Sequence, residues 1–215
     1  MSNTREKESS LLKDIAYKKI KELLLIEHFE PGQLLSEREL IDILSMSKTP
    51  IKSALVRLEA EGFVTISSKQ GIYINDLSLQ RIIDIYDLRT ALETFNCRQL
   101  VGKLTKEQVA KLKRNLDETE GIVKKLDVQG FTDHDHAFHL MLSEFVNNLE
   151  IHRILLNYHD HLQRITFRHL RKDPNRMRLF WEEHVEIFHY LCDGDIRSVD
   201  SMEKHLQDSK RKLFL

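Results

Sequence analysis

Apolar residues between positions 11 and 28 recur at helical spacing, which predicts an amphipathic helix with one buried face. Pro31-Gly32 then interrupts the pattern. A short second helix is predicted after Ser36, because Ser36 and Glu39 have the spacing of a capping box and apolar residues follow.

The pattern next predicts a third helix and a β-hairpin. Thr49 as N-cap and Pro50 at the first helical position would begin this helix, and Gly62 would end it. Two short β-prone runs, 63–66 and 72–74, follow with a five-residue connection between them. Helix, helix, turn, helix and hairpin form the order of a winged helix-turn-helix, whose second motif helix enters the major groove of DNA.

From about residue 78 onward the apolar period is that of long helices. Capping residues and breaks divide this part into six helices with no strand, which predicts an all-α antiparallel helical bundle. The chain is therefore expected to be mainly α, with a winged helix-turn-helix domain over 8–76 and a helical domain over 77–215. The expected helix starts lie at Ser78, Thr105, Gly130 to Thr132, after Asn147-Asn148, at Asp173-Pro174 and at Gly194-Asp195.

Composition and charge narrow the function classes. The 215 residues carry a formal net charge of −1, which excludes a uniformly basic nucleic-acid coat. The sequence contains two cysteines, has no apolar signal core at its start, and has no apolar run near the roughly 20 residues that span a bilayer. These features predict a cytoplasmic protein that does not enter a membrane.

A local concentration of positive charge changes the picture for the N-terminal part. The stretch 43–58 contains Lys48, Lys52 and Arg57 and no acidic residue. A positive helix start with free amide groups is a natural phosphate-binding feature. The alternative is that three helices and a hairpin form only a small scaffold whose lysines are solvated.

Four segments of this N-terminal part together resemble the GntR family of bacterial transcription regulators. In that family the matching residues contact operator DNA or lie at the wing tip, and the family usually has Arg where Lys48 and Lys52 stand. Lys keeps the charge but lacks the bidentate fork that reads guanine. The segments are 35–40, 47–55, 57–64 and 71–74, and the DNA-binding positions that the resemblance implies are Ser36, Arg38, Lys48, Thr49, Lys52, Lys69, Gln70 and Gly71.

The histidines of the C-terminal part suggest a metal site. Asp135 and His139 are separated by four residues, so one helix face presents a carboxylate beside an imidazole. His184 and His205 lie about equally far from the turn that joins the last two helices, so they can lie level in the bundle. These four side chains could converge on one divalent ion, although such an Asp–His pair can also be a surface hydrogen bond. His159 and His161 point to different sides of a helix and are expected to be solvated.

The same residues resemble the FCD ligand-binding domain of the FadR subfamily. The resemblance covers roughly residues 78–212 and rests on Asp135–His139, Glu183-His184, Gly194-Asp195 and His205-Leu206. It implies that Asp135, His139, His184 and His205 bind a divalent metal, zinc or nickel, and that a small organic acid is the effector. Arg89 could then recognise the effector's carboxylate, or could simply pair with a neighbouring acid.

The leading hypothesis is a homodimeric, ligand-responsive transcription regulator that binds a pseudo-palindromic operator. A metal-dependent hydrolase with an accessory DNA-binding-like head is a second hypothesis, and a regulator that senses the metal itself is a third. Against an enzyme, no general base stands out beside the proposed ligands, and no nucleophile elbow or phosphate loop is found in the sequence.

Overall fold

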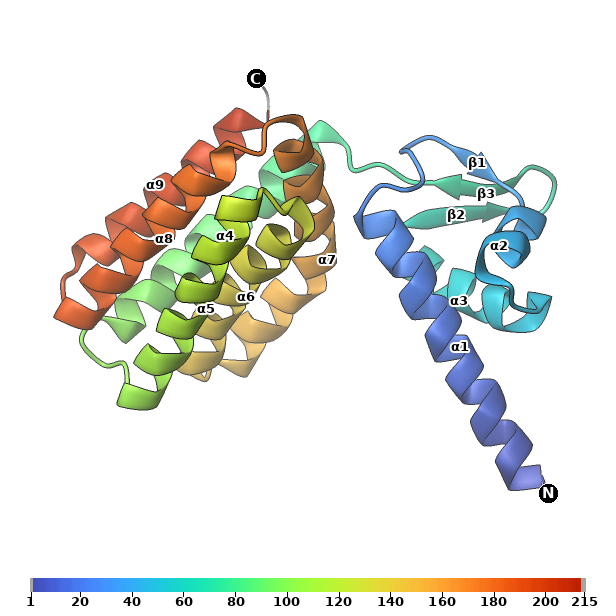
Figure 1. The fold of residues 1–215 in the computed structure, drawn as a ribbon, viewed down its shortest axis with the longest axis horizontal. Coiled ribbons are helices and arrows are strands. Elements are labelled where there is room, and N and C mark those ends of the chain that lie inside the picture. Colours follow the sequence, from blue (N-terminus) through green and yellow to red (C-terminus); the bar gives the residue numbers. More distant parts are fainter. Residues whose placement is uncertain (1, 214–215) are drawn as a thin grey trace. The chain divides into compact units, whose positions relative to one another are not determined.

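The computed structural model describes residues 2–213, and for residues 2–10 it describes the backbone alone. The chain divides into two compact units, Met1–Leu77 and Ser78–Leu215. In Figure 1 the first unit is coloured blue to teal and the second green to red.

The N-terminal unit combines three helices with a small antiparallel sheet (Figure 1). Apolar residues from all of these elements, among them Leu24, Leu58 and Val64, form one buried core. This arrangement confirms the predicted winged helix-turn-helix. The elements are α1 (Ser2–Leu25), β1 (Leu34–Leu35), α2 (Glu37–Leu44), α3 (Lys48–Ala60), β2 (Val64–Ser67) and β3 (Gly71–Ile74).

The sheet has three strands in the order β1-β3-β2, one strand more than predicted. In the register of the sheet, Leu35 pairs with Ile72 on one side and Ile66 pairs with Ile72 on the other. Strand β1 has two residues, too few for an alternating pattern to be visible in the sequence. It forms only by pairing with β3, which belongs to the hairpin later in the chain.

The helix starts of this unit follow the capping rules in one case and depart from them in the other. At α2 the predicted capping box is present: Ser36 Oγ accepts from the Glu39 amide at 3.1 Å, and Glu39 Oε2 accepts from the Ser36 amide at 2.7 Å. The prediction for α3 was wrong, because Ser47 is the N-cap and Pro50 occupies the third helical position. Proline is tolerated there because the first four amides of a helix have no intrahelical partner.

The C-terminal unit is an antiparallel bundle of six helices, as predicted, and no strand occurs in it up to residue 213 (Figure 1). Three helices begin at other residues than expected, with Asp127, Asn175 and Ile196 as the N-caps of α6, α8 and α9. Two clusters of buried apolar side chains hold the bundle together. The helices are α4 (Leu79–Leu100), α5 (Lys106–Lys125), α6 (Val128–Val146), α7 (Leu149–Lys172), α8 (Arg176–Asp193) and α9 (Arg197–Lys212).

Within the described part of the chain, no helix combines the length and the apolar character that crossing a membrane requires.

Candidate metal centre and candidate DNA-binding face

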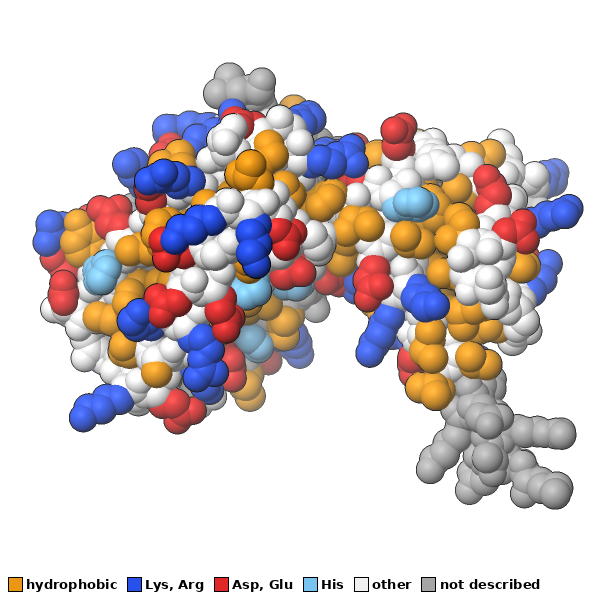
Figure 2. Space-filling model, in the orientation of Figure 1, with side chains coloured by type: hydrophobic (Ala, Val, Ile, Leu, Met, Phe, Trp, Pro, Cys, Tyr) orange, Lys and Arg blue, Asp and Glu red, His pale blue; other side chains and the backbone are white. Residues whose placement is uncertain are grey.

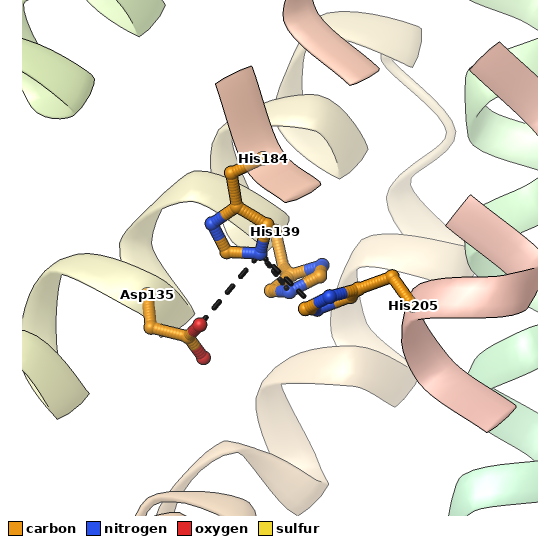
Figure 3. A group of neighbouring side chains, drawn as sticks. All are labelled: Asp135, His139, His184 and His205. Atoms are coloured by element: carbon orange, nitrogen blue, oxygen red, sulfur yellow. Dashed lines mark hydrogen bonds and ion pairs between the residues drawn. The ribbon is translucent and has the colours of Figure 1, made fainter. Parts of the chain in front are cut away.

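Four predicted ligands converge in the interior of the bundle. Asp135 and His139 lie one turn apart on α6, His184 comes from α8, and His205 comes from α9 (Figure 3). Each offers one ligand atom, and these atoms all lie within 4.8 Å of one another. All four side chains are buried, with exposed fractions of 2–5%.

The distances between these atoms suit coordination of a single ion. His184 Nε2 lies 3.1 Å from His139 Nε2, 3.2 Å from His205 Nε2 and 3.6 Å from Asp135 Oδ1. Ligand bonds of about 2.1 Å place neighbouring donor atoms roughly 3.0–3.4 Å apart around a metal. The four side chains therefore have the spacing of a coordination shell.

Two carboxylates outside this group determine which ring nitrogens face inward. Glu93 Oε2, on α4, accepts a hydrogen bond from His139 Nδ1, and Glu183 Oε2 accepts from His205 Nδ1 at 2.7 Å. A proton held on Nδ1 leaves Nε2 with its lone pair, which is the form that binds a metal. The lone pairs of His139 and His205 thus point toward the same small volume as His184 Nε2.

The electrostatic environment favours uncharged imidazoles at the centre. Burial lowers the pKa of His139 and of His184 well below the ordinary value, and Arg89 and the neighbouring histidines act in the same direction. Burial raises the pKa of Asp135 to about 6, against the opposing effect of His205 and Arg89. Neutral imidazoles and a buried carboxylate form a donor set that a divalent cation fits, since the cation supplies the positive charge that compensates an ionised carboxylate in the interior.

Arg89 lies on α4 beside this centre, and the sequence left open whether it pairs with a neighbouring acid or recognises the carboxylate of an effector. Its Nε donates to Glu93, so it does pair with a neighbouring acid. Its Nη2, however, is buried and has no hydrogen-bond partner among the described residues. Arg89 is 4% exposed.

A cavity of about 20 Å³ adjoins Arg89 and the centre. Its lining includes Asp135 and His205 of the candidate metal centre, and the remaining side chains are Tyr86, Thr166, His169, Phe180, Ser209 and Leu213. A volume of this size holds about one water molecule. The cavity is therefore lined both by Arg89, which carries the unpartnered nitrogen, and by two of the four candidate ligands.

Sequence reasoning missed the two outer carboxylates and misplaced other histidines. Glu93 could have been found as the acid one turn after Arg89. Nothing in the sequence, however, links Glu183 on α8 to His205 on α9. His161 was expected to be solvated and is buried, on a helix that packs against α6 and α4. His159 was expected to be solvated as well and is half-buried.

The predicted DNA-binding residues lie on the surface of the N-terminal unit. Arg38 on α2, Lys48, Thr49 and Lys52 on α3, and Lys69 and Gln70 at the turn between β2 and β3 are all exposed. Ser36 caps α2, and Gly71 begins β3 with a φ of +111°. Figure 2 shows positively charged side chains along the edge of this unit that carries α2 and that turn.

An acid that was not predicted lies among these cations. Glu37, at the first position of α2, is 2.8 Å from Lys48 Nζ and 3.6 Å from Lys52 Nζ. The bond from Lys48 keeps the pKa of Glu37 below its ordinary value, so the carboxylate is ionised at neutral pH. The structure thus brings Lys48 and Lys52 together around one negative charge.

Comparison with family models gives two matches that follow the two units. The model for bacterial regulatory proteins of the gntR family matches residues 12–74, and the FCD domain model matches residues 84–208. Together they cover most of the chain.

Similar full-length proteins are transcription regulators. The Nta operon transcriptional regulator of Aminobacter aminovorans is 30% identical over 77% of this chain and 77% of its own length. The HTH-type transcriptional repressor RspR of Escherichia coli is 26% identical over 83% of this chain and 78% of its own length. Among solved structures, McbR/YncC of E. coli superposes with a TM-score of 0.78 at 20% identity, covering 94% of this chain and 97% of that one, which shows the shared fold.

Proposed function

The chain belongs to the GntR family of bacterial regulatory proteins and carries an FCD domain, and from this premise we propose how the transcriptional regulator works. A homodimer binds a pseudo-palindromic operator through its winged units. Each helical unit holds a divalent metal, zinc or nickel, on Asp135, His139, His184 and His205. A small organic acid bound beside the metal is the effector.

The observation that carries the metal assignment is the convergence of the four buried ligand atoms. Imidazole and carboxylate donors suit zinc and nickel among the divalent ions. Glu93 and Glu183 orient two of the three imidazoles, as outer carboxylates do in metal sites generally. Keeping Asp135 ionised in the interior is unfavourable because burial removes the carboxylate from water. A bound cation would offset this desolvation.

The assignment of a carboxylate effector rests on Arg89 and the cavity. A buried guanidinium nitrogen without a partner is costly, and a carboxylate would satisfy it with a charge-assisted hydrogen bond. The other carboxylate oxygen would lie on the metal side of the cavity, where Asp135 and His205 form the wall. Since the cavity holds about one water molecule, a small acid enters when lining side chains such as Leu213 move aside.

The DNA assignment rests on the exposed cations of the winged unit. Lys48 and Lys52 project from the start of α3, the helix that this fold places in the major groove. Lys69 and Gln70 occupy the wing tip, and Arg38 lies on α2. The half-site spacing of the operator would follow from the separation of the two winged units in the dimer.

One titration tests the proposal. An operator selected from random DNA by the purified chain is titrated with the zinc-loaded protein, with the chelator-treated protein, and with the zinc-loaded protein in acetate or succinate. We expect the dissociation constant to change when acid is added to the zinc-loaded protein, and not when it is added to chelator-treated protein. His184→Ala should lose bound zinc and the acid response, whereas His134→Ala, a histidine outside the centre, should keep both.

Two results would contradict the proposal. Binding that follows the free zinc concentration and ignores every acid would make the ion itself the signal. Full zinc occupancy in His184→Ala would remove the four-ligand centre.

A further inference from the structure

The outward face of α4 has an unusual composition. At 100° per residue, Asp84, Leu88, Ala91, Phe95 and Arg98 fall within an arc of about 80°, and all five are exposed. We call these five residues the outer α4 stripe. Leu88 is 37% exposed and Phe95 is 39% exposed, whereas the solvent face of a bundle helix is ordinarily polar.

The inward face of the same helix is already occupied. Tyr86, Arg89, Glu93 and Cys97 are buried there, and α4 packs against α6 and α9. The outer stripe lies on the opposite side of the helix from these residues. It is therefore an apolar surface that the helices of its own unit leave uncovered.

The stripe is complementary to itself when it is reversed. Asp84 and Arg98 lie seven residues before and after Ala91, roughly 10 Å away along the helix in each direction. Leu88 and Phe95 lie three and four residues from Ala91. In an antiparallel pair with a two-fold axis at Ala91, each Asp84 faces an Arg98, each Leu88 faces a Phe95, and the two alanines meet.

The charged ends of the stripe are available for such a contact. Asp84 accepts a hydrogen bond from the neutral amide of Gln80 at 2.8 Å. No side chain in residues 11–213 forms a hydrogen bond or ion pair with Arg98. Both charges are thus uncompensated within the described part of the chain, and they have opposite signs at opposite ends.

We propose that the outer α4 stripe is the centre of an isologous interface between two copies of this chain, with the two α4 helices antiparallel across a two-fold axis at Ala91. The inference rests on the homodimer of the proposed function and adds the surface that forms it. In an isologous contact every pair of facing residues occurs twice, once on each side of the two-fold axis. The reversed self-complementarity of the stripe meets this requirement. Ala91 suits the crossing point because a small side chain lets helix axes approach to about 8 Å.

The stripe forms the centre of the contact and flanking helices complete it. Stable dimers bury about 800 Å² on each partner, which is more than five residues of one helix provide. The placement also has a consequence for sensing. Arg89 and Glu93 lie on the inner face of the helix whose outer face contacts the second copy, so a movement of α4 would reach both the metal centre and the interface.

A charge exchange tests the pairing. Sedimentation of the full-length chain over a range of concentrations gives the dimer dissociation constant for wild type, Asp84→Arg, Arg98→Glu and the double variant. Each single variant places like charges opposite each other twice, and we expect the dissociation constant to rise about tenfold. The double variant restores opposite charges and should return to within about threefold of wild type.

A second pair of variants tests the apolar part. Phe95→Asp should raise the dimer dissociation constant by about a hundredfold or more, since a buried charge would lie at the contact. Leu179→Asp is the matched control, because Leu179 on α8 is 41% exposed and lies outside the stripe. Circular dichroism of each variant establishes that the bundle is folded.

Three outcomes would overturn the inference. One is a dimer that persists with an unchanged dissociation constant in Phe95→Asp; the chain would then pair through another surface, and the operator and metal assignments would stand. Another is a double charge variant that is weaker than either single variant. The third is a wild-type chain that stays monomeric at every concentration, which would remove the homodimer as well.

Discussion

Glu93 connects two side chains that have different proposed tasks. One carboxylate oxygen accepts from Arg89 and the other from His139 Nδ1, and all three residues are buried. The carboxylate therefore balances the charge of Arg89 and fixes the orientation of a candidate ligand at the same time. A carboxylate behind an imidazole raises its basicity and its affinity for a metal.

Replacing Glu93 should weaken metal binding without removing a ligand. We expect Glu93→Gln to lower the affinity for zinc by 10–100-fold, the range of outer-carboxylate substitutions in general. Competition with a chromogenic chelator measures the affinity. Glu118→Gln is the control, because Glu118 contacts His134, which is not a candidate ligand, at 3.4 Å. Equal affinities in the two variants would remove Glu93 from the support of the centre.

Lys52 should act on DNA through its charge. We expect Lys52→Ala to weaken binding to every DNA sequence and to lower the slope of log K against log salt by about one. Lys113→Ala provides the control, since Lys113 lies on α5 and pairs with Asp117 at 2.8 Å. An unchanged slope would remove Lys52 from the phosphate contacts.

Glu37 supplies a variant that should act in the opposite direction. Its carboxylate lies 3.6 Å from Lys52 Nζ and repels an approaching phosphate. Glu37→Gln should therefore lower the dissociation constant for DNA that lacks the operator sequence. A weaker complex in this variant would mean that Glu37 supports the lysines rather than competing with the phosphate.

At the scale of elements, the sequence predicts those features that depend on neighbours in the chain. The capping box at Ser36, the hairpin and the six bundle helices all follow from local spacing and are present. Strand β1 and the bond between Glu183 and His205 depend on segments that meet only in the folded chain. The convergence of the four candidate ligands was predictable because helix geometry sets Asp135 against His139, and a short turn sets His184 level with His205.

Gly71 shows how one backbone position supports the small sheet. Its φ is +111°, and a Cβ atom there would lie 2.6 Å from the carbonyl oxygen of Leu35 in β1. Gly62 also has a positive φ, +83°, but a Cβ atom there would meet nothing within 4 Å. The two glycines therefore share the backbone requirement and differ in the steric one.

Alanine at these two positions should separate the two costs. We expect Gly62→Ala to lower the free energy of unfolding of the winged unit by about 1–2 kcal/mol, the cost of a positive φ for an L-residue. Gly71→Ala should lower it by roughly 1–3 kcal/mol more, because β1 must shift to relieve the contact. Hydrogen exchange of peptides from residues 12–74 measures both. Equal losses would mean that β1 moves away freely.

For the molecule as a whole, the two units can be followed by different signals. Trp181 is the one tryptophan of the sequence and lies in the bundle, where its indole donates to the carbonyl oxygen of Leu116 at 3.0 Å. Tryptophan fluorescence therefore reports the C-terminal unit alone. Ten of the 11 histidines also belong to residues 77–215, and His28 is the exception.

The buried histidines make the metal-free bundle sensitive to acid. Burial lowers the pKa of His136, His139 and His184 well below 6.5, so these rings stay neutral in the folded chain while the unfolded chain takes up protons. Stability from these groups is present above pH 6.5 and is lost as the pH falls below it. Asp135 acts in the opposite direction, because its pKa is raised to about 6 and the folded chain binds its proton first.

Burial also lowers the pKa of His169 to about 4 and raises the pKa of Asp133. Four histidines against two aspartates leave a net uptake of up to two protons on unfolding. The stability of the metal-free bundle should therefore fall by up to about 3 kcal/mol per pH unit between pH 6.5 and 5. Urea unfolding followed by Trp181 fluorescence, with and without zinc, measures this loss. Zinc should raise the midpoint at pH 7.5, and the gain should vanish toward pH 5 because protons compete for the same nitrogens. Hydrogen exchange of the winged unit, which carries one histidine, serves as the internal control. Its protection factors, in which the intrinsic pH dependence of exchange is divided out, should stay level. A bundle midpoint that is independent of both pH and zinc would mean that these imidazoles neither lie buried nor bind a metal.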